Sequence, residues 1–174
     1  MKLIILLLLA CLALTACTRA AKNEQQTEQT EMRAEGTVPQ GEALLNVLNA
    51  NEQSLVVLNN DSLSYYNGHG VSDLLELLTN EPNRLKHAFV ADKMVGRAAA
   101  VLMAAAGVRE VHTNLISTPA LEVLREAGIP VFFSEEVPQI LNRDQSGQCP
   151  IDALLNDADD VDECVEILKA RFQQ

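Results

Sequence analysis

A continuous apolar run, AAAVLMAAA at residues 98–106, sets the strongest limit on the architecture of this chain. Gly107 ends the run, and Asp92 stands before it in a position typical of a helix N-cap, so the sequence predicts one helix over residues 92–106. A helix that is apolar nearly all round has no face that prefers water, and it therefore lies inside a domain. The rest of the fold has to surround this helix.

The segments on both sides of this helix alternate between strand and helix patterns. Short apolar stretches predict strands at residues 54–58, 63–66, 88–90, 110–116 and 129–133. Helical spacing and end signals predict further helices at residues 43–48, 71–78, 118–128, 150–156 and 161–172. Because residues 59–61 are typical of a turn, the first two strands are expected to form a hairpin. The order predicts an α/β fold, a three-layer α/β/α sandwich with a mixed sheet.

The first 16 residues have the composition of an export signal. Lys2 is followed by an apolar run from Leu3, which ends in Leu-Thr-Ala-Cys at residues 14–17, a sequence similar to a bacterial lipobox. The run is shorter than the ~20 apolar residues that span a bilayer, so a cleaved signal is favoured over an uncut anchor. Cys17 would then be the first residue and carry acyl chains, two or more of which anchor a protein stably.

This signal predicts a membrane partner and a location. Lipid on Cys17 would hold the protein to the cell envelope outside the cytoplasm, and Thr18, in place of an aspartate linked to inner-membrane retention, favours the outer membrane. Residues 17–41 are rich in Gln, Glu and Thr and are expected to form a disordered tether, which leaves residues 42–174 as one domain. With 24 acidic against 13 basic residues and no run of bases, the chain is not expected to bind nucleic acid.

Two motifs in the domain resemble those of a family of unknown function. They are ADKMVGRAAA at residues 91–100, and NR at 142–143 followed by GQCP at 147–150. The family is the one catalogued as domain of unknown function 1893, and the similarity runs over most of residues 42–172, including LLELL at 74–78. The resemblance implies a cytidine-deaminase-like fold, which agrees with the predicted order of strands and helices. It implies no established activity.

Zinc-dependent deamination is not expected. Deaminases of that fold hold zinc with a His or Cys and two Cys, and a nearby Glu transfers protons. The corresponding positions here, residues 92–93 and 117–121, contain neither His nor Cys. His87 is followed by Phe89 where the glutamate would stand, and Cys149 precedes Pro150 in the reverse of the required order. The sequence therefore predicts no bound metal and no cofactor.

The acidic residues between 157 and 163 do not form a calcium loop. A loop starting at Asp157 would need a glycine in its middle and a glutamate at its twelfth position, where Leu168 stands. Asp160 is instead expected to cap the last helix, with further acids in the first turn.

The best candidate site lies at the start of the helix predicted over residues 92–106. Lys93 and Arg97 are four residues apart and would share one face of its positive end, with Asp92 and Gly96 beside them. Such an arrangement suits an anion. The alternative is that Asp92 only caps the helix and the two bases are solvated.

Two further polar segments are candidates for the same ligand. In deaminase-like folds the pocket lies at helix starts, so the resemblance adds Ser117 and Thr118 at the start of the next helix. Asn142 and Arg143 fall in a polar loop, where a guanidinium can clamp a carboxylate or phosphate. A plain surface loop explains that last pair equally well.

Cys149 allows three interpretations. At the N-cap of the helix predicted over 150–156 its thiolate would be stabilised, and with His69 or His112 brought near by the fold it could act as a nucleophile. In an oxidising compartment it could instead pair with Cys164. A structural turn is the interpretation that the sequence favours.

These observations favour binding over catalysis. The leading hypothesis is a lipid-anchored extracytoplasmic domain that binds a small anionic or nucleotide-like ligand, or an unidentified protein partner, without zinc chemistry. The first alternative is a metal-free enzyme that uses Asp92, Lys93 and Cys149. The second is a structural or assembly lipoprotein, which would expose a sizeable apolar patch instead of a pocket.

Overall fold

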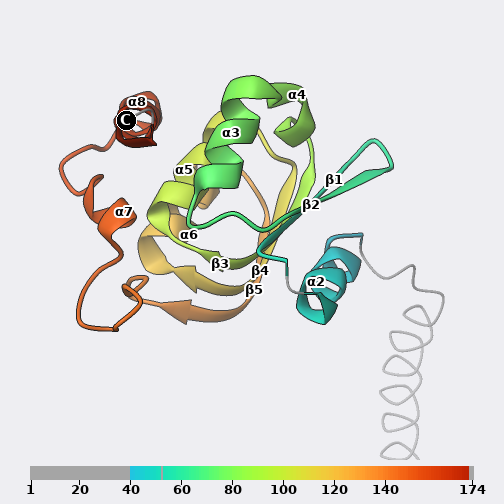
Figure 1. Ribbon diagram of the computed structural model, residues 1–174, viewed down its shortest axis with the longest axis horizontal. Helices are drawn as coiled ribbons and strands as arrows, with labels where there is room; N and C mark the ends of the chain where they lie inside the picture. The colour runs from blue at the N-terminus through green and yellow to red at the C-terminus, as the bar shows by residue number, and fades with distance from the viewer. Residues whose placement is uncertain (1–39, 52, 173–174) are drawn as a thin grey trace, which may run out of the picture. The chain divides into compact units, whose positions relative to one another are not determined.

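The computed structural model describes residues 40–51 and 53–172, which form an α/β domain around one mixed sheet (Figure 1). The strands are β1 Leu55–Asn59, β2 Ser62–Tyr66, β3 Phe89–Val95, β4 Glu110–Ser117 and β5 Val131–Val137. The helices are α2 Gln40–Ala50, α3 Ser72–Asn80, α4 Pro82–Leu85, α5 Arg97–Ala106, α6 Thr118–Glu126, α7 Pro150–Ala153 and α8 Val161–Phe172. The five strands lie in the order β2-β1-β3-β4-β5. Strand β1 runs antiparallel to β2 and β3, whereas β3, β4 and β5 are parallel, so the predicted α/β class and mixed sheet are confirmed.

The two faces of the sheet are covered unequally. Among the helices that the structure describes, only α2 packs on one face, where Leu44 and Leu48 meet Val56 of β1 and Ala91 of β3. On the other face a larger apolar cluster joins the sheet to α3, α4, α5, α6 and α8. Helix α5 lies in the middle of this cluster, with residues 98–103 all buried, as its apolar composition predicts. The left-handed φ of 64° at Gly107 ends it, which a residue with a Cβ adopts only at a cost.

The predicted start of this helix is wrong. Asp92 does not cap it, because residues 89–95 continue as β3: Asp92 pairs with Leu55 of β1 and with Thr113 of β4. Gly96 is the N-cap, with an extended backbone, and the first helical residue is Arg97. Residues 92–95 therefore take their conformation from two neighbouring strands, and these contacts are distant in the sequence.

In both β3 and β4 the alternation of side chains between the two faces of the sheet is interrupted once along the strand. Val90 and Val95 lie in the same buried cluster although they are five residues apart, and so do Val111 and Ile116. Side chains alternate along a regular strand, so an odd separation would put each pair on opposite faces. Each strand therefore contains an irregularity between these positions.

The irregularity coincides with a pair of neighbouring polar side chains. Asp92 and Thr113 are opposite each other in the sheet. The N–H of Met94 donates to Asp92 Oδ1 at 3.0 Å, and the N–H of Leu115 donates to Thr113 Oγ1 at 3.3 Å. Each side chain thus holds the backbone two residues further on, a local bond that competes with regular strand geometry.

Other local predictions are confirmed with small shifts. The β1–β2 hairpin turns at Asn60 and Asp61, whose φ angles of 46° and 62° are those of a type I′ turn. Asp160 caps α8 by accepting from the N–H groups of Asp162 and Glu163 at 2.9 and 3.1 Å. Strand β5 extends further than expected, to Val137, while α7 is shorter and ends at Ala153. Helix α4 has no counterpart among the predicted elements.

The described part of the chain belongs to one compact unit, residues 38–174. Every buried residue of its two apolar clusters lies between Leu44 and Leu168. Gly41 also belongs to this packing, since a Cβ there would lie 1.9 Å from the His112 ring, and only glycine allows α2 to lie so close to β4. A fragment of residues 38–174 thus contains its complete described core and is expected to fold alone.

The predicted signal, Cys17 and nearly all of the tether lie outside the described residues. None of the helices that the structure describes is both long and apolar enough to cross a membrane.

Candidate functional site

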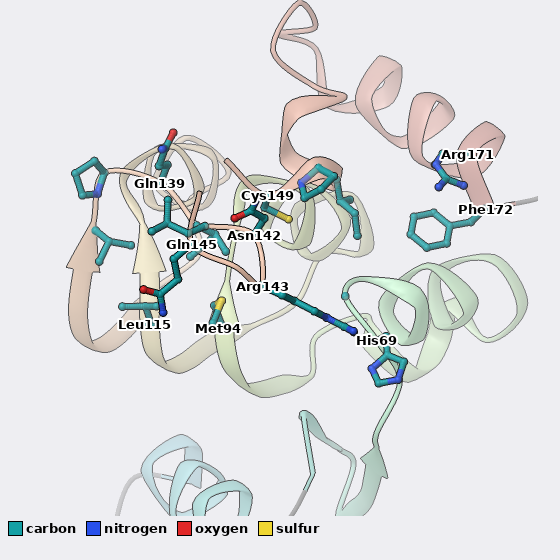
Figure 2. A pocket seen from close by; sticks show the side chains of 17 residues that line it. His69, Met94, Leu115, Gln139, Asn142, Arg143, Gln145, Cys149, Arg171 and Phe172 are labelled. Atoms are coloured by element: carbon teal, nitrogen blue, oxygen red, sulfur yellow. The ribbon is translucent and has the colours of Figure 1, made fainter. Parts of the chain in front are cut away.

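A large open cavity lies at the carboxyl ends of the parallel strands (Figure 2). Its volume is about 1270 Å³, and Met94, Leu115 and Val137 of β3, β4 and β5 form part of its wall. The loop between β5 and α7 supplies most of the remaining wall, with His69 and Gly70 before α3 and Arg171 and Phe172 at the end of α8. In open α/β sheets, ligands bind in the crevice that the loops form outside the carboxyl ends of the strands.

The polar lining of this cavity is basic. Of the 17 described residues that line it, Arg143, Arg171 and His69 are basic, and none is an aspartate or a glutamate. This is unusual in a chain with 24 acidic and 13 basic residues. Within the described residues neither guanidinium has a hydrogen bond or an ion pair, so both are available to an anion.

Of the residues that the sequence analysis predicts to bind a ligand, two line the cavity, Asn142 and Arg143. The amide of Asn142 is already engaged within its own loop. Its Oδ1 accepts from the N–H groups of Ser146 and Gly147 at 2.9 and 3.2 Å, and its Nδ2 donates to Ser146 Oγ at 3.1 Å. Asn142 therefore shapes the loop, and Arg143 is the side chain left to meet a ligand.

The predicted anion site at the start of α5 is filled by the protein itself. The Asp152 carboxylate accepts from the N–H of Arg97 at 3.2 Å and from the N–H of Ala98 at 2.9 Å. A Cβ on Gly96 would lie 2.5 Å from Asp152 Oδ2, so glycine is needed for this approach. Burial raises the pKa of Asp152, although these two N–H groups and the Arg97 charge oppose the rise.

The expected pairing of Lys93 with Arg97 on one helix face is wrong. Lys93 belongs to β3 and is exposed, whereas Arg97 opens α5. The Arg97 guanidinium donates to the carbonyls of Leu155 and Ala158, both at 2.5 Å, and lies 3.8 Å from the Asp159 carboxylate. Arg97 thus fastens the segment after α7 to α5.

Ser117 and Thr118 also have partners within the protein. Ser117 is the N-cap of α6, and its Oγ accepts from the N–H of Ala120 at 3.3 Å. Thr118 Oγ1 donates to Glu136 Oε1 at 2.8 Å. Neither residue is among the described residues that line the cavity. A ligand role for either one stays a prediction.

Comparison with known proteins identifies the family of this chain. The family model described as "TM1506: Domain of unknown function (DUF1893)" matches residues 43–172. The chain belongs to the DUF1893 family. This confirms the resemblance carried by residues 91–100 and 142–150.

A solved structure supports the same conclusion. It is the crystal structure of a DUF1893 family protein (TM1506) from Thermotoga maritima at 2.70 Å resolution, which is 29% identical to this chain with a TM-score of 0.69. The match covers 75% of this chain and 88% of the other. A search of the curated proteins finds no match. The cytidine-deaminase-like fold implied by the resemblance stays an expectation.

A half-buried acid, Asp92, lies beside the cavity of this DUF1893 domain. Burial raises the pKa of Asp92 to about 7, the N–H of Met94 opposes the rise, and the Asp73 carboxylate adds to it. Asp92 itself does not line the cavity, although Met94, two residues on, does. The Asp73 carboxylate is held by the N–H of Gly68 at 2.6 Å.

Cys149 is the nucleophilic side chain in the DUF1893 cavity. It is half-buried at the N-cap of α7, and no hydrogen bond from its side chain caps that helix. Cys164 is buried elsewhere, with its Sγ 3.6 Å from the carbonyl oxygen of Ala158, and both thiols are free. The alternative of a Cys149–Cys164 disulfide is therefore not what the structure shows.

Of the two histidines considered as its partner, only His69 lines the same cavity. His112 is buried in the sheet, 2.5 Å from Glu110 Oε1 and stacked on the Phe132 ring with 4.7 Å between centroids. Within the described part of the chain, no three His, Cys, Asp or Glu side chains form a group that could hold a metal ion.

The two cysteines are expected to react at very different rates. In the folded fragment of residues 38–174, iodoacetamide should alkylate Cys149 readily. It should alkylate Cys164 on the order of a hundredfold more slowly, because Cys164 is buried and reacts only when the core opens. Burial also raises the pKa of the Cys164 thiol, which lowers its thiolate fraction. Mass spectrometry of timed samples measures both rates, with a urea-unfolded sample as the control. Equal rates in the folded fragment would contradict the structure.

Proposed function

We propose that this DUF1893 domain binds a small anionic ligand in the cavity at the carboxyl ends of β3, β4 and β5, without zinc chemistry. The observation that carries the proposal is the charge of the lining. Two unpaired guanidiniums and an imidazole face a cavity whose described lining contains no carboxylate. Guanidinium groups bind carboxylates and phosphates through paired charge-assisted hydrogen bonds.

Binding is favoured over metal-free catalysis by the placement of the candidate catalytic residues. Cys149 lines the cavity, but Asp92 and Lys93 do not, so the structure does not bring the three groups of that hypothesis to one surface. The remaining combination, Cys149 with His69, lacks a third group to orient the imidazole among the described residues of the lining. A purely structural or assembly role is less favoured because the domain has a large basic-lined cavity.

The test replaces both guanidiniums. The double variant Arg143→Ala with Arg171→Ala is expected to bind anions about tenfold more weakly, because two exposed charge-assisted contacts are lost. A thermal-shift screen of fragment 38–174 with inorganic phosphate, nucleotides and short carboxylates finds an anion, and calorimetric titration measures its affinity. The matched control is Lys86→Ala with Arg125→Ala, which removes two exposed bases that do not line the cavity. Equal loss in both variants, or no anion bound by the unaltered fragment, would refute the proposal.

We also propose that the domain is lipid-anchored outside the cytoplasm, in the cell envelope, with the outer membrane favoured. The support is the sequence at residues 2–17, with Cys17 as the acceptor and Thr18 after it. Metabolic labelling with an alkyne fatty acid is expected to mark the unaltered chain and to leave Cys17→Ser unlabelled. The control is Cys11→Ser, inside the signal, which should still be labelled. Labelling of Cys17→Ser would contradict the anchor.

A further inference from the structure

We propose that the ligand of this cavity is a single-chain anionic amphiphile, with a carboxylate or phosphate head at the basic side chains and a hydrocarbon chain along the apolar wall. This inference rests on the proposed function, since it names the class of anion that the same cavity takes. It follows from three features: the position of the basic side chains in the cavity, the exposure of its apolar side chains, and the use of the starts of α5 and α6 by the protein's own side chains.

The basic side chains of the lining gather on one side of the cavity. Figure 2 shows the Arg143 side chain reaching toward His69, with Arg171 and Phe172 on the same side, while Met94 and Leu115 lie on the other side together with Gln139 and Gln145. A ligand that spans the cavity thus meets positive charge at one end and uncharged side chains, Met94 and Leu115 among them, at the other. Charge alone would be met by any small anion, but this division is matched by an anion with an apolar body.

The apolar wall is unusually exposed. Met94, Leu141 and Phe172 are 48%, 45% and 38% exposed and all line this one cavity. Exposed apolar side chains gathered in one concave place mark a binding surface, because water leaves them on binding. The volume of about 1270 Å³ exceeds the ~300–1,000 Å³ typical of small-ligand sites and gives room for a chain of many methylenes.

A nucleotide fits the surroundings less well. Nucleotide phosphates in α/β folds bind the free N–H groups at a helix start. Here Asp152 accepts from two N–H groups at the start of α5, and Ser117 accepts from one at the start of α6. The starts of α3 and α7 have no side-chain cap. The starts of the two helices that follow the parallel strands β3 and β4 are thus already used by the protein, which leaves the side chains of Arg143 and Arg171 as the main contacts for an anionic head.

The described lining is also less suited to recognising a nucleobase. The Asn142 amide, which could bond to the edge of a base, is used inside its loop. The described lining contains no Tyr or Trp, and its aromatic rings are those of Phe172 and His69. The cavity thus favours a flexible chain over a planar ring.

The experiment is a chain-length series. Alkyl phosphates and alkyl carboxylates of four, eight and twelve carbons are titrated calorimetrically into fragment 38–174, below their micelle concentrations, beside dodecanol, inorganic phosphate, AMP and ATP. Each added methylene is expected to strengthen binding roughly threefold to fourfold, the factor for ~0.8 kcal/mol. Dodecyl phosphate and dodecanoate should bind at least tenfold more tightly than dodecanol, and more tightly than AMP or ATP. Bound dodecyl phosphate should also slow alkylation of Cys149, which lines the cavity.

Variants separate the two ends of the cavity. Arg143→Ala with Arg171→Ala should remove the preference for an anionic head and leave the dependence on chain length. Met94→Glu with Leu141→Glu should flatten the chain-length series, whereas the matched control Leu63→Glu with Tyr65→Glu, on exposed residues of β2, should leave it unchanged. If the glutamate variant fails to fold by circular dichroism, Met94→Ala with Leu141→Ala tests the same wall by a smaller decrease in slope.

The outcomes distinguish this inference from the proposed function. Suppose that phosphate or nucleotides bind and need Arg143 and Arg171, but the affinity of the alkyl ligands does not rise with chain length. This result would overturn the proposal of an amphiphilic ligand and leave the proposal of anion binding intact. Tighter binding of AMP or ATP than of dodecyl phosphate would do the same. Failure of every anion to bind would overturn both. A chain-length dependence that the Leu63 and Tyr65 control abolishes equally would show adsorption to exposed apolar surface and would also overturn the amphiphile.

Discussion

Replacing Asp152 by alanine is expected to lower the free energy of unfolding of fragment 38–174 by about 3 kcal/mol, because the two charge-assisted hydrogen bonds that cap a buried helix start are lost. Asp152 is only 6% exposed, and its carboxylate accepts from the N–H groups of Arg97 and Ala98 at the buried start of α5. Without it both N–H groups lose their acceptor inside the protein. Their desolvation is then no longer compensated, which costs more than the average hydrogen bond contributes.

Urea denaturation at pH 7 measures this effect. The matched control is Asp157→Ala, which removes an exposed aspartate from the same segment and should change the free energy of unfolding by less than about 0.5 kcal/mol. Asp152→Asn keeps an oxygen acceptor for one N–H and should fall between the two. An Asp152→Ala variant as stable as the control would show that the carboxylate does not cap α5.

The same substitution should also weaken ligand binding. Asp152 belongs to α7, whose neighbours Cys149, Pro150 and Ile151 line the cavity. Asp152 and the Arg97 guanidinium are the contacts that fasten this segment to α5. Without these contacts α7 is no longer held against α5, and the part of the cavity wall formed by α7 and the loop before it loses its fixed position. Affinity should therefore fall in Asp152→Ala although Asp152 touches no ligand, and stay unchanged in the Asp157→Ala control.

Asp92→Asn is expected to stabilise the domain at pH 8 and to have little effect at pH 4. The pKa of the folded-state carboxyl is raised to about 7 from its usual 3.8, chiefly by burial. Well below pH 3.8 the carboxyl is protonated in both the folded and the unfolded chain, so it does not lower the stability of the fold, and at pH 4 its effect is still small. Between about pH 4 and pH 7 the unfolded chain gives up this proton while the folded protein keeps it, so stability falls across that interval and levels off above the folded pKa of about 7.

The expected gain at pH 8 is about 2 kcal/mol, less than the roughly 4 kcal/mol that about 1.4 kcal/mol per pKa unit would give. The residue is only half-buried, and water that reaches it screens the charge. Asparagine keeps an oxygen to accept the Met94 N–H, so the strand irregularity is preserved. Urea denaturation from pH 4 to pH 8 compares the unaltered fragment, Asp92→Asn and the exposed control Asp157→Asn. Parallel pH profiles for the unaltered fragment and Asp92→Asn would contradict the raised pKa.

Local patterns in the sequence predict the elements whose contacts are close along the chain. The β1–β2 hairpin follows from residues 59–61, and the start of α8 follows from Asp160, whose bonds span two and three residues. The start of α6 follows from Thr118 and Pro119, with Ser117 as its cap. Each of these signals is complete within one turn of backbone, and no pairing with a distant strand competes with it.

The candidate site was predicted less well, and for one physical reason. At residues 92–95 the cap pattern of Asp92 competes with pairing to β1 and β4, and the strand pairing prevails because it satisfies a row of backbone groups at once. Because residues 92–95 form a strand instead of the first turn of a helix, Lys93 and Arg97 do not share a helix face. Arg143 was found because its loop is polar, whereas Arg171 has no local signal and joins the cavity only because α8 ends beside it.

The sequence by itself determined the class of fold and its centre: an apolar run at residues 98–106 can only be a buried helix among layers, and alternating strand and helix patterns supply those layers. Only the tertiary structure decided which charges are free. Asp152, 55 residues from Arg97 in the chain, closes the start of α5, and the charge that remains for a ligand lies on Arg143 and Arg171 instead. Hydrophobic periodicity depends on neighbours within a turn or two, but the pairing of a buried charge depends on whatever the fold brings beside it.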